Sequence, residues 1–270
     1  MTLKIRLAGI SRLTAALVTA AAAALGVGAV AVDHAPAASA ATTPAYFPTH
    51  LTHLGTAKQA IVVTSTSWST SYATLRTYEK GRDGVWRQKF GPMAARIGTK
   101  GFALASARRQ GSLTTPAGTF TITRAFGAYA NPGTKLAYTK FDKNDYWVYD
   151  PRDPSTYNVY ETSRSAKAIW RTADAERLAD WGTRQYRYAA VINFNMPSGV
   201  MRSASKGQYV ATHAANTSRG GGIFLHVNGF GSTAGCVSVS YDNEKALLRW
   251  MDPTKGVRIV MGPQSVITRM

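Results

Sequence analysis

The stretch LHVNGFGSTAGCVSV, residues 225–239, holds the single cysteine of the chain, Cys236, and one histidine, His226. It lies within a longer segment, Gly220 to Tyr241, that contains no Asp, Glu, Lys or Arg, although these types make up 17% of the chain. An uncharged segment of this length predicts the interior of the fold or the lining of a cleft. We expect residues 222–227 to form a buried strand, and the glycine-rich turn after it to return the chain to Cys236.

His226 and Cys236 would then lie side by side on neighbouring strands. An imidazole within hydrogen-bond reach of a thiol takes its proton, and the thiolate attacks a carbonyl carbon far better than the thiol does. Gly235 has no side chain to shield the sulfur, and the backbone N–H groups of Gly235 and Cys236 would bind the oxyanion that develops during acyl transfer. The alternative is a small buried thiol beside a core histidine. His213, in a polar loop, competes for the role of base.

The N-terminus has the pattern of a secretory signal over residues 1–40. Three basic residues precede an apolar stretch, Leu13 to Val32, that ends near Ala38-Ser39-Ala40. This order of regions predicts export with cleavage after Ala40. An uncleaved membrane anchor is the alternative, although the high Ala and Gly content argues against stable spanning. With one cysteine, an exported chain has no internal disulfide. Cys236 is therefore either a thiol tolerated in a buried site or a nucleophile.

The chain is strongly basic, with 32 Lys and Arg against 14 Asp and Glu. Removing residues 1–40 takes away three basic residues and one acidic residue, which leaves a net charge of about +16. Such a charge favours anionic surroundings, which for an exported protein are anionic wall polymers or lipid head groups; a merely solvated basic surface is the alternative. The basic residues are scattered and lack a nucleic-acid-binding motif, so we expect no nucleic-acid partner.

Short β-rich runs separated by Gly and Pro predict a mainly β protein, a β-rich α+β fold with a few short helices. The expected strands are 59–64, 72–79, 85–90, 120–125, 146–149, 189–193, 222–227 and 257–261, with a hairpin loop at 80–84. Two helices are expected, Ala173–Trp181 and Tyr241–Met251, the second capped by Ser240 or Asp242 and packed behind the strand that carries the cysteine. We expect a linker over 41–55 and one domain over 56–265, in which 56–92 supply extra strands.

At this point the chain resembles the L,D-transpeptidase (YkuD-type) catalytic domain family. The family's core motif is a histidine, a spacer, Ser or Thr, usually His, and then Gly-Cys; here it corresponds to His226 and to Thr233-Ala234-Gly235-Cys236. The Thr-Pro-x-Gly-x-Phe segment of the family is present at Thr115–Phe120, and the tract Tyr188–Asn195 is similar to the family strand before the catalytic half. Together these motifs cover about residues 95–262 and imply a mixed β-sandwich.

The resemblance implies a peptidoglycan cross-linking enzyme. Cys236 would attack the carbonyl of the L-centred third residue of a stem tetrapeptide and expel the terminal D-alanine, with His226 as base and then acid. The thioester would pass to a side-chain amine of a second stem. A neighbouring possibility is capture by water, which gives an L,D-carboxypeptidase or a hydrolase. A second class of function is a catalytically silent basic module that binds the cell wall.

The chain also departs from the family pattern. The spacer after His226 is shorter than usual, Ala234 replaces a common histidine, and Ser238 stands where the family often has Asn or Arg. These changes affect the expected substrate more than the nucleophile, the base or the oxyanion donors. We expect four residues at the substrate-binding edge, namely Thr233, Ser232, Asn228 and His213. We expect a monomer with no metal site and no cofactor, since no cluster has ligand spacing.

Overall fold

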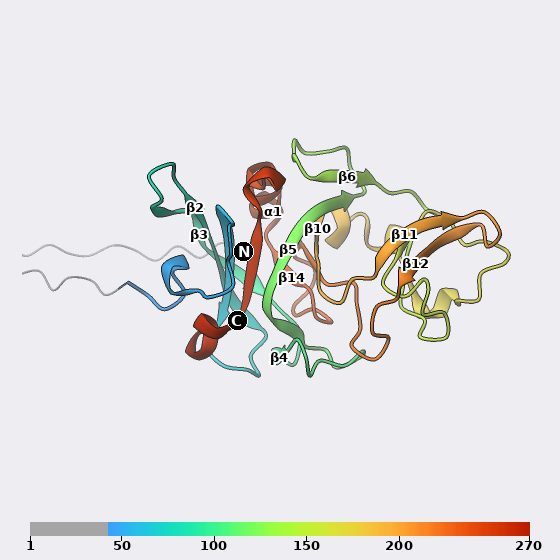
Figure 1. Ribbon diagram of the computed structural model, residues 1–270, viewed down its shortest axis with the longest axis horizontal. Coiled ribbons are helices and arrows are strands. Elements are labelled where there is room, and N and C mark those ends of the chain that lie inside the picture. The colour runs from blue at the N-terminus through green and yellow to red at the C-terminus, as the bar shows by residue number, and fades with distance from the viewer. Residues whose placement is uncertain (1–42) are drawn as a thin grey trace, which may run out of the picture. The chain divides into compact units, whose positions relative to one another are not determined.

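A ten-stranded mixed sheet dominates residues 43–270, the part of the chain that this computed structural model describes (Figure 1). The predicted signal peptide, residues 1–40, lies outside the described residues. The strands of the sheet are β1 (Gln59–Ser65), β2 (Tyr72–Lys80), β3 (Trp86–Arg96), β4 (Phe102–Leu104), β5 (Thr115–Gly127), β6 (Ala137–Lys140), β10 (Ala189–Ile192), β13 (Phe224–Val227), β14 (Val237–Val239) and β15 (Arg258–Pro263). Their order is β10-β13-β14-β3-β2-β1-β15-β5-β4, with β6 also paired to β5. The mainly β fold predicted from the sequence is confirmed.

The long strand β5 closes this sheet on itself. Residues 118–121 of β5 pair with β15, and residues 122–126 pair with β10 at the other end of the strand order. Eight strands therefore form a continuous ring, from β10 through β14 and β1 back to β5. Figure 1 shows β5 as a long, curved strand, as such a closure requires. A closed ring leaves fewer unpaired strand edges than an open sheet.

The interior of the ring is the main hydrophobic core. Side chains along a strand point alternately to the two faces of a sheet. Along β13, Leu225 and Val227 belong to the ring core, whereas Phe224 lies in a second cluster outside the ring. That second cluster also contains Phe126, Trp147 and Tyr186, and Cys236 packs against it. The cysteine therefore lies on the outer side of the closed sheet.

A small three-stranded sheet covers this outer cluster. Its order is β8-β7-β9, and it consists of β7 (Tyr146–Val148), β8 (Tyr160–Glu161) and β9 (Ala175–Arg177). A separate hairpin, β11 (Ser198–Ser203) with β12 (Gln208–His213), was not predicted from the sequence. Most of its side chains are exposed or half-buried, so its sequence lacks the alternation of apolar and polar residues by which a strand is recognised.

The α-helix α1 (Tyr241–Trp250) confirms one of the two predicted helices. The hydroxyl of Ser240 caps it by accepting a hydrogen bond from the N–H of Asn243. Leu247 and Leu248 are fully buried in the ring core, and the helix contacts both β13 and β14. The helix thus packs behind the strand that follows the cysteine.

The other predicted helix, Ala173–Trp181, is wrong. The structure has two 3₁₀ turns there, on either side of β9, which pairs with β7. The carboxylate of Glu176, in the middle of β9, accepts hydrogen bonds from Tyr149 and Tyr186. These tertiary contacts outweigh the weak helix propensity of the segment.

The remaining regular elements are short 3₁₀ helices. They are η1 (Pro48–His50), η2 (Thr172–Asp174), η3 (Leu178–Trp181), η4 (Gln185–Arg187), η5 (Pro253–Lys255) and η6 (Gln264–Arg269). Part of the expected linker packs on the domain, since Leu51 and Leu54 are buried in a cluster with Tyr78 and Ile267. Within residues 43–270, no helix combines the length and the apolar composition needed to cross a bilayer.

Candidate active site

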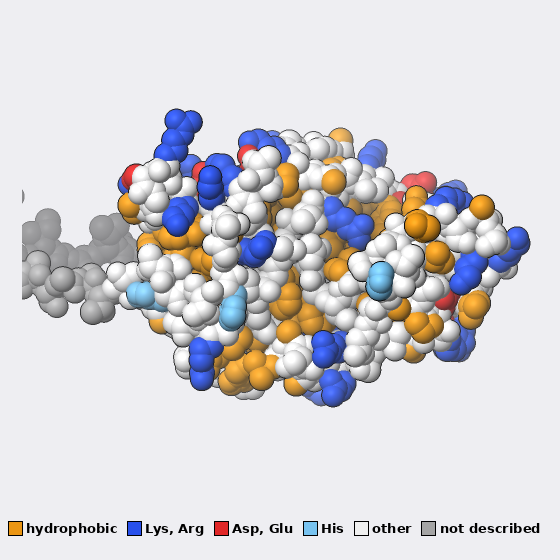
Figure 2. Space-filling model, in the orientation of Figure 1, with side chains coloured by type: hydrophobic (Ala, Val, Ile, Leu, Met, Phe, Trp, Pro, Cys, Tyr) orange, Lys and Arg blue, Asp and Glu red, His pale blue; other side chains and the backbone are white. Residues whose placement is uncertain are grey.

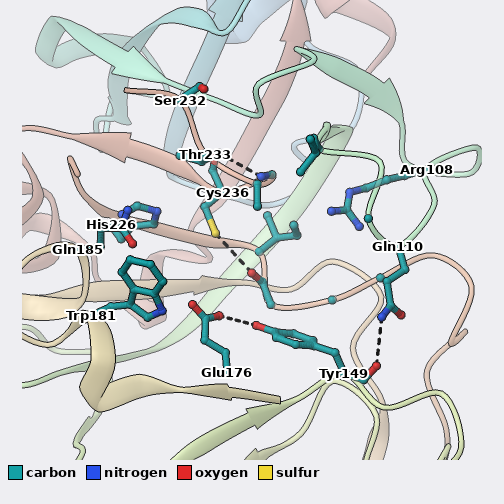
Figure 3. Close-up of a pocket in the computed structure, with 18 of the residues that line it drawn as sticks. Arg108, Gln110, Tyr149, Glu176, Trp181, Gln185, His226, Ser232, Thr233 and Cys236 are labelled. Carbon is teal, nitrogen blue, oxygen red and sulfur yellow. Dashed lines mark hydrogen bonds between the residues drawn. The ribbon is translucent and has the colours of Figure 1, made fainter. Parts of the chain in front are cut away.

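The parallel pairing of β13 with β14 brings His226 and Cys236 to one place. In this register Leu225 lies opposite Val237 and His226 lies opposite Ser238, so Cys236 comes directly before the paired part of β14. Both residues line a pocket with a cavity volume of about 460 Å³ (Figure 3). Cys236 is partly exposed there, as a group that meets a substrate must be.

His226 is held as a neutral base. Its side chain is only 3% exposed, and Nδ1 lies 2.7 Å from the carbonyl oxygen of Val227. A carbonyl only accepts hydrogen bonds, so Nδ1 carries the proton and Nε2 keeps a free lone pair. Burial lowers the pKa of His226 to about 4, and the hydrogen bond to Val227 offsets only part of this effect. A backbone carbonyl therefore orients the imidazole of His226.

The thiol of Cys236 is bonded to backbone groups. Its Sγ donates to the carbonyl of Gly222 and accepts from the N–H of Phe224, each at 3.4 Å. Burial raises the pKa of the thiol to about 12; the charge of Glu176 raises it as well, and the N–H of Phe224 lowers it. Within the described chain no hydrogen bond joins this sulfur to His226. The resting site therefore holds a neutral thiol beside a neutral imidazole.

Thr233 fixes the turn that presents the cysteine. Its Oγ1 donates to the carbonyl of Cys236 at 2.7 Å and accepts from the N–H of Gly235 at 3.1 Å. Its backbone pairs with the start of the loop after β3, where Thr99 N–H donates to the Thr233 carbonyl at 2.9 Å. The hydroxyl of Ser232 bonds to that of Thr99 at 2.8 Å. Thr233 and Ser232 both line the pocket, but the hydroxyl of Thr233 is bonded within the turn and that of Ser232 to Thr99.

Gly235 needs to be glycine for a geometric reason. Its φ is +148°, a conformation that residues with a side chain rarely adopt. A Cβ atom at this position would lie 2.8 Å from Nη2 of Arg108 and 2.9 Å from the carbonyl oxygen of Thr114. Because its N–H already bonds to Thr233, Gly235 supplies no free donor for an oxyanion, and the N–H of Cys236 is the remaining candidate.

The Thr-Pro-x-Gly-x-Phe segment supports the same turn from the opposite side. Thr115, the first residue of β5, accepts a hydrogen bond from the N–H of Gly98 at 2.9 Å and donates to the Cys236 carbonyl at 3.4 Å. The side chain of Thr115 is fully buried. The buried Thr115 hydroxyl therefore holds the turn that carries Cys236.

Two of the residues expected at the substrate-binding edge lie outside the pocket. His213 is exposed at the end of β12, where its Nδ1 bonds to the hydroxyl of Thr212. Asn228 is exposed, and its N–H donates to the carbonyl of Val239. Neither residue lines the cavity. Both residues therefore lie apart from the pocket that holds His226 and Cys236, unlike the placement expected from the sequence.

Two charged residues of the pocket were missed by the sequence reasoning. Arg108, one of the scattered basic residues of the chain, is only 4% exposed and lines the cavity. Glu176, which fell within the wrongly predicted helix, lines it too and bonds to Tyr149 and Tyr186 at 2.8 Å each. Tyr186 in turn lies edge-on to the ring of His226, with centroids 5.6 Å apart. No local sequence pattern identifies these residues, because each reaches the site through tertiary packing.

Comparison with known families agrees with this geometry. The family model of the L,D-transpeptidase catalytic domain, YkuD, matches residues 59–260. The chain belongs to this family. The match runs from β1 into β15 and so includes the ring, apart from the end of β15, as well as His226 and Cys236. No curated protein and no solved structure gives a significant match. The resemblance noted from the sequence is thereby confirmed, and membership implies peptidoglycan as the general substrate of this L,D-transpeptidase domain.

Proposed function

We propose that this L,D-transpeptidase domain is exported and cross-links peptidoglycan stem peptides through an acyl-enzyme on Cys236. The observation that carries the proposal is the pairing of a thiol with a neutral imidazole in one pocket of a family member. Nδ1 of His226 is anchored on Val227, so Nε2 is the group that accepts a proton. Low pKa values of buried imidazoles suit a base that must be unprotonated before it acts.

The first half-reaction forms the thioester. Sγ of Cys236 bonds to the carbonyl carbon of the third stem residue while its proton passes to Nε2 of His226. The bond from that carbon to the nitrogen of the terminal D-alanine then breaks, and the imidazolium returns the proton to the leaving nitrogen. The N–H of Cys236 faces the oxyanion that exists between these two steps.

The second half-reaction transfers the acyl group. A side-chain amine of a second stem attacks the thioester carbon and gives a proton to Nε2 of His226. The carbon–sulfur bond breaks, and Sγ takes that proton back. The products are an amide cross-link and the neutral thiol with which the cycle began.

Surface charge supports work next to an anionic wall. On the face in Figure 2, Lys and Arg side chains are spread over the surface and outnumber Asp and Glu. Positive charge that is spread over a surface attracts an anionic polymer without specificity for one sequence or shape. Export itself rests on residues 1–40, and we propose that the mature chain acts as a monomer in the wall.

The test is product analysis by mass spectrometry after incubation with disaccharide tetrapeptides, with wild type beside Cys236→Ala. Cross-linked dimers and free D-alanine from the wild type alone would support transpeptidation. Trimmed tripeptides without dimers would replace the amine by water as acceptor and make the protein a carboxypeptidase. Dimers from a folded Cys236→Ala variant would exclude the cysteine mechanism.

A second candidate is the silent wall-binding module, and the resting geometry favours it in one respect. The thiol is protonated and bonded to Gly222, and it makes no hydrogen bond to His226 in residues 43–270. Such a module would bind peptidoglycan without becoming acylated. A carbapenem provides a strained carbonyl that tests this point, because a covalent adduct on Cys236 would eliminate the silent module.

A further inference from the structure

Arg108 is a buried cation with no acidic partner in the described chain. It follows β4, and its side chain is only 4% exposed. Nε donates to the carbonyl of Thr114 at 2.8 Å, and Nη1 donates to the carbonyl of Arg219 at 2.6 Å. The ion pairs among residues 43–270 do not include it. A buried charge is costly unless it is paired, so a guanidinium that lacks an acidic partner in a cavity attracts an anion.

The unpaired part of this guanidinium points toward the nucleophile. Among the described residues, Nη2 of Arg108 has no hydrogen-bond partner, because Nε and Nη1 make the two bonds. It lies against Gly235, where a Cβ would be 2.8 Å from it. The missing side chain of Gly235 therefore lets Nη2 lie close against the turn that carries Cys236. The charge also reaches the sulfur, since it opposes the rise in the pKa of Cys236 that burial and Glu176 produce.

The other walls of the pocket have a different character. In the view of Figure 3, Arg108 and His226 lie on opposite sides of Cys236. Glu176 lies on a third side and is held there by Tyr149. An anionic group of a substrate is attracted by Arg108 and is repelled by Glu176 when that carboxyl group is ionised; burial raises the pKa of Glu176. The pocket thus favours one orientation of a bound peptide, with its anionic group toward Arg108.

We propose that Arg108 binds the free carboxylate of the residue that leaves the donor peptide. The site would then select donors in which the scissile bond joins the last residue to the chain. This inference rests on the proposed acyl transfer and names the residue that determines its donor. The chemistry fits, because in a terminal amino acid the carboxylate carbon is three bonds beyond the scissile carbonyl carbon. A carbonyl at Sγ therefore places that carboxylate beside the sulfur, where Nη2 gives a charge-assisted hydrogen bond.

The first test compares two donors that differ only at the last group. One is the tetrapeptide with a free C-terminal carboxylate, and the other is its C-terminal carboxamide. We expect wild type to be acylated at least about tenfold faster by the free acid, as loss of a hydrogen bond to a charged group predicts. Arg108→Met should lose this preference. Arg109→Met is the matched control, because Arg109 is exposed and lies outside the pocket. Equal rates for the two donors in wild type would overturn the inference without any variant.

The second test does not depend on transpeptidation. Iodoacetate and iodoacetamide alkylate the same thiolate of Cys236, so the ratio of their rate constants is independent of the fraction of thiolate present. We expect this ratio to fall about tenfold from wild type to Arg108→Met and to stay unchanged in Arg109→Met. An unchanged ratio in a folded Arg108→Met protein would refute anion binding by Arg108. Should neither donor acylate any variant while this ratio still falls, the proposed function fails and the anion site stands.

Arg108 also supports Thr114 and Arg219, so its replacement tests the fold as well as the site. Arg108→Lys keeps the charge and loses the planar fork of donors. We expect this variant to retain part of the preference for iodoacetate over iodoacetamide. Circular dichroism and thermal melting of each variant separate loss of the anion site from loss of folded protein. A folded Lys variant with the same ratio as the Met variant would show that a positive charge without the planar fork does not produce the preference.

Discussion

The thiol of Cys236 donates its hydrogen to the carbonyl of Gly222, across an Sγ–O distance of 3.4 Å. The same sulfur accepts a hydrogen bond from Phe224, so backbone groups of one segment hold it from two directions. The hydrogen bond from the thiol to Gly222 must break before the thiol proton can reach His226. In the proposed mechanism the free protein is thus in a resting state, and a substrate that displaces the thiol from Gly222 would complete the catalytic pair.

This resting state predicts slow alkylation of Cys236 by iodoacetamide at neutral pH. Burial and the charge of Glu176 raise the pKa of the thiol to about 12, well above the value of about 8.5 for a free cysteine. A raised pKa means less thiolate at any given pH below it. The rate should therefore climb about tenfold per pH unit between about pH 7 and about pH 10, with no plateau. The rate is measured as the loss of free thiol. A plateau within that pH range would contradict the raised pKa of Cys236.

The low pKa of His226 predicts the acid limit of acylation. Because the pKa is lowered to about 4, the imidazole is neutral and able to accept a proton at every pH above that value. Acylation by a donor peptide should therefore decline only as the pH falls toward about 4. His226→Gln should slow acylation by about a hundredfold or more. His213→Gln, at an exposed position outside the pocket, should retain the wild-type rate, and an equal loss in both variants would contradict the role of His226.

Glu176→Gln should make Cys236 more reactive toward iodoacetamide. The charge of Glu176 raises the pKa of the thiol, so removing the charge lowers that pKa and increases the thiolate at a fixed alkaline pH. Gln keeps one acceptor for the two tyrosine hydroxyls. The control is Asp180→Asn, which removes an exposed carboxylate of the same segment. Rates are measured by mass spectrometry of the Cys236 peptide, and a slower reaction in Glu176→Gln would refute the electrostatic effect.

Thr233→Val should destabilise the turn before the cysteine. The substitution keeps the shape of the side chain and removes the hydrogen bonds to the Cys236 carbonyl and from the Gly235 N–H. We expect a loss of about 1–3 kcal/mol in the free energy of unfolding, together with slower acylation. Ser232→Ala removes an exposed hydroxyl pair instead and should change stability by less than about 0.5 kcal/mol. Urea denaturation of the two variants measures the difference.

Glu244 should make the fold less stable as the pH rises. This carboxyl group on α1 is fully buried, and neither oxygen has a hydrogen-bond partner among the described residues. Burial raises its pKa well above the ordinary value of 4.5. The unfolded chain therefore loses a proton above about pH 4.5 that the folded chain keeps, so stability is greatest below that pH and falls above it.

Replacing Glu244 by Met removes this dependence. The variant should be more stable than wild type by about 1–3 kcal/mol near neutral pH, and by less at about pH 4. Chemical denaturation at both pH values gives the two differences. Equal differences would mean that Glu244 does not titrate on unfolding in this range.

The sequence predicted the strands that alternate or are continuously apolar, because burial on a sheet imposes those patterns. β1, β2 and β13 are of this kind, and so is α1 with its Ser240 cap. It did not predict β9, because Ala, Glu and Leu favour a helix locally and only the pairing with β7 and the bonds to Glu176 override that preference. The hairpin β11–β12 was not predicted because its strands have no buried face that would impose an apolar pattern on the sequence.

The site divides in the same way. His226 and Cys236 were recognisable because an uncharged, glycine-rich segment holds both of them. Arg108 and Glu176 were not, since each lies far along the chain from the cysteine and among ordinary charged residues. Their places in the pocket follow from burial and from the Gly235 and tyrosine contacts, and these exist only in the folded chain.

The most direct measurement is the intact mass of the protein after it is mixed with a donor tetrapeptide and the reaction is rapidly quenched. Peptide mapping then identifies the modified residue. The proposed mechanism predicts an adduct equal to the donor minus its terminal D-alanine, attached as a thioester to Cys236 and absent from Cys236→Ala. Product formation by a folded Cys236→Ala protein, or an adduct on any residue other than Cys236, would contradict it.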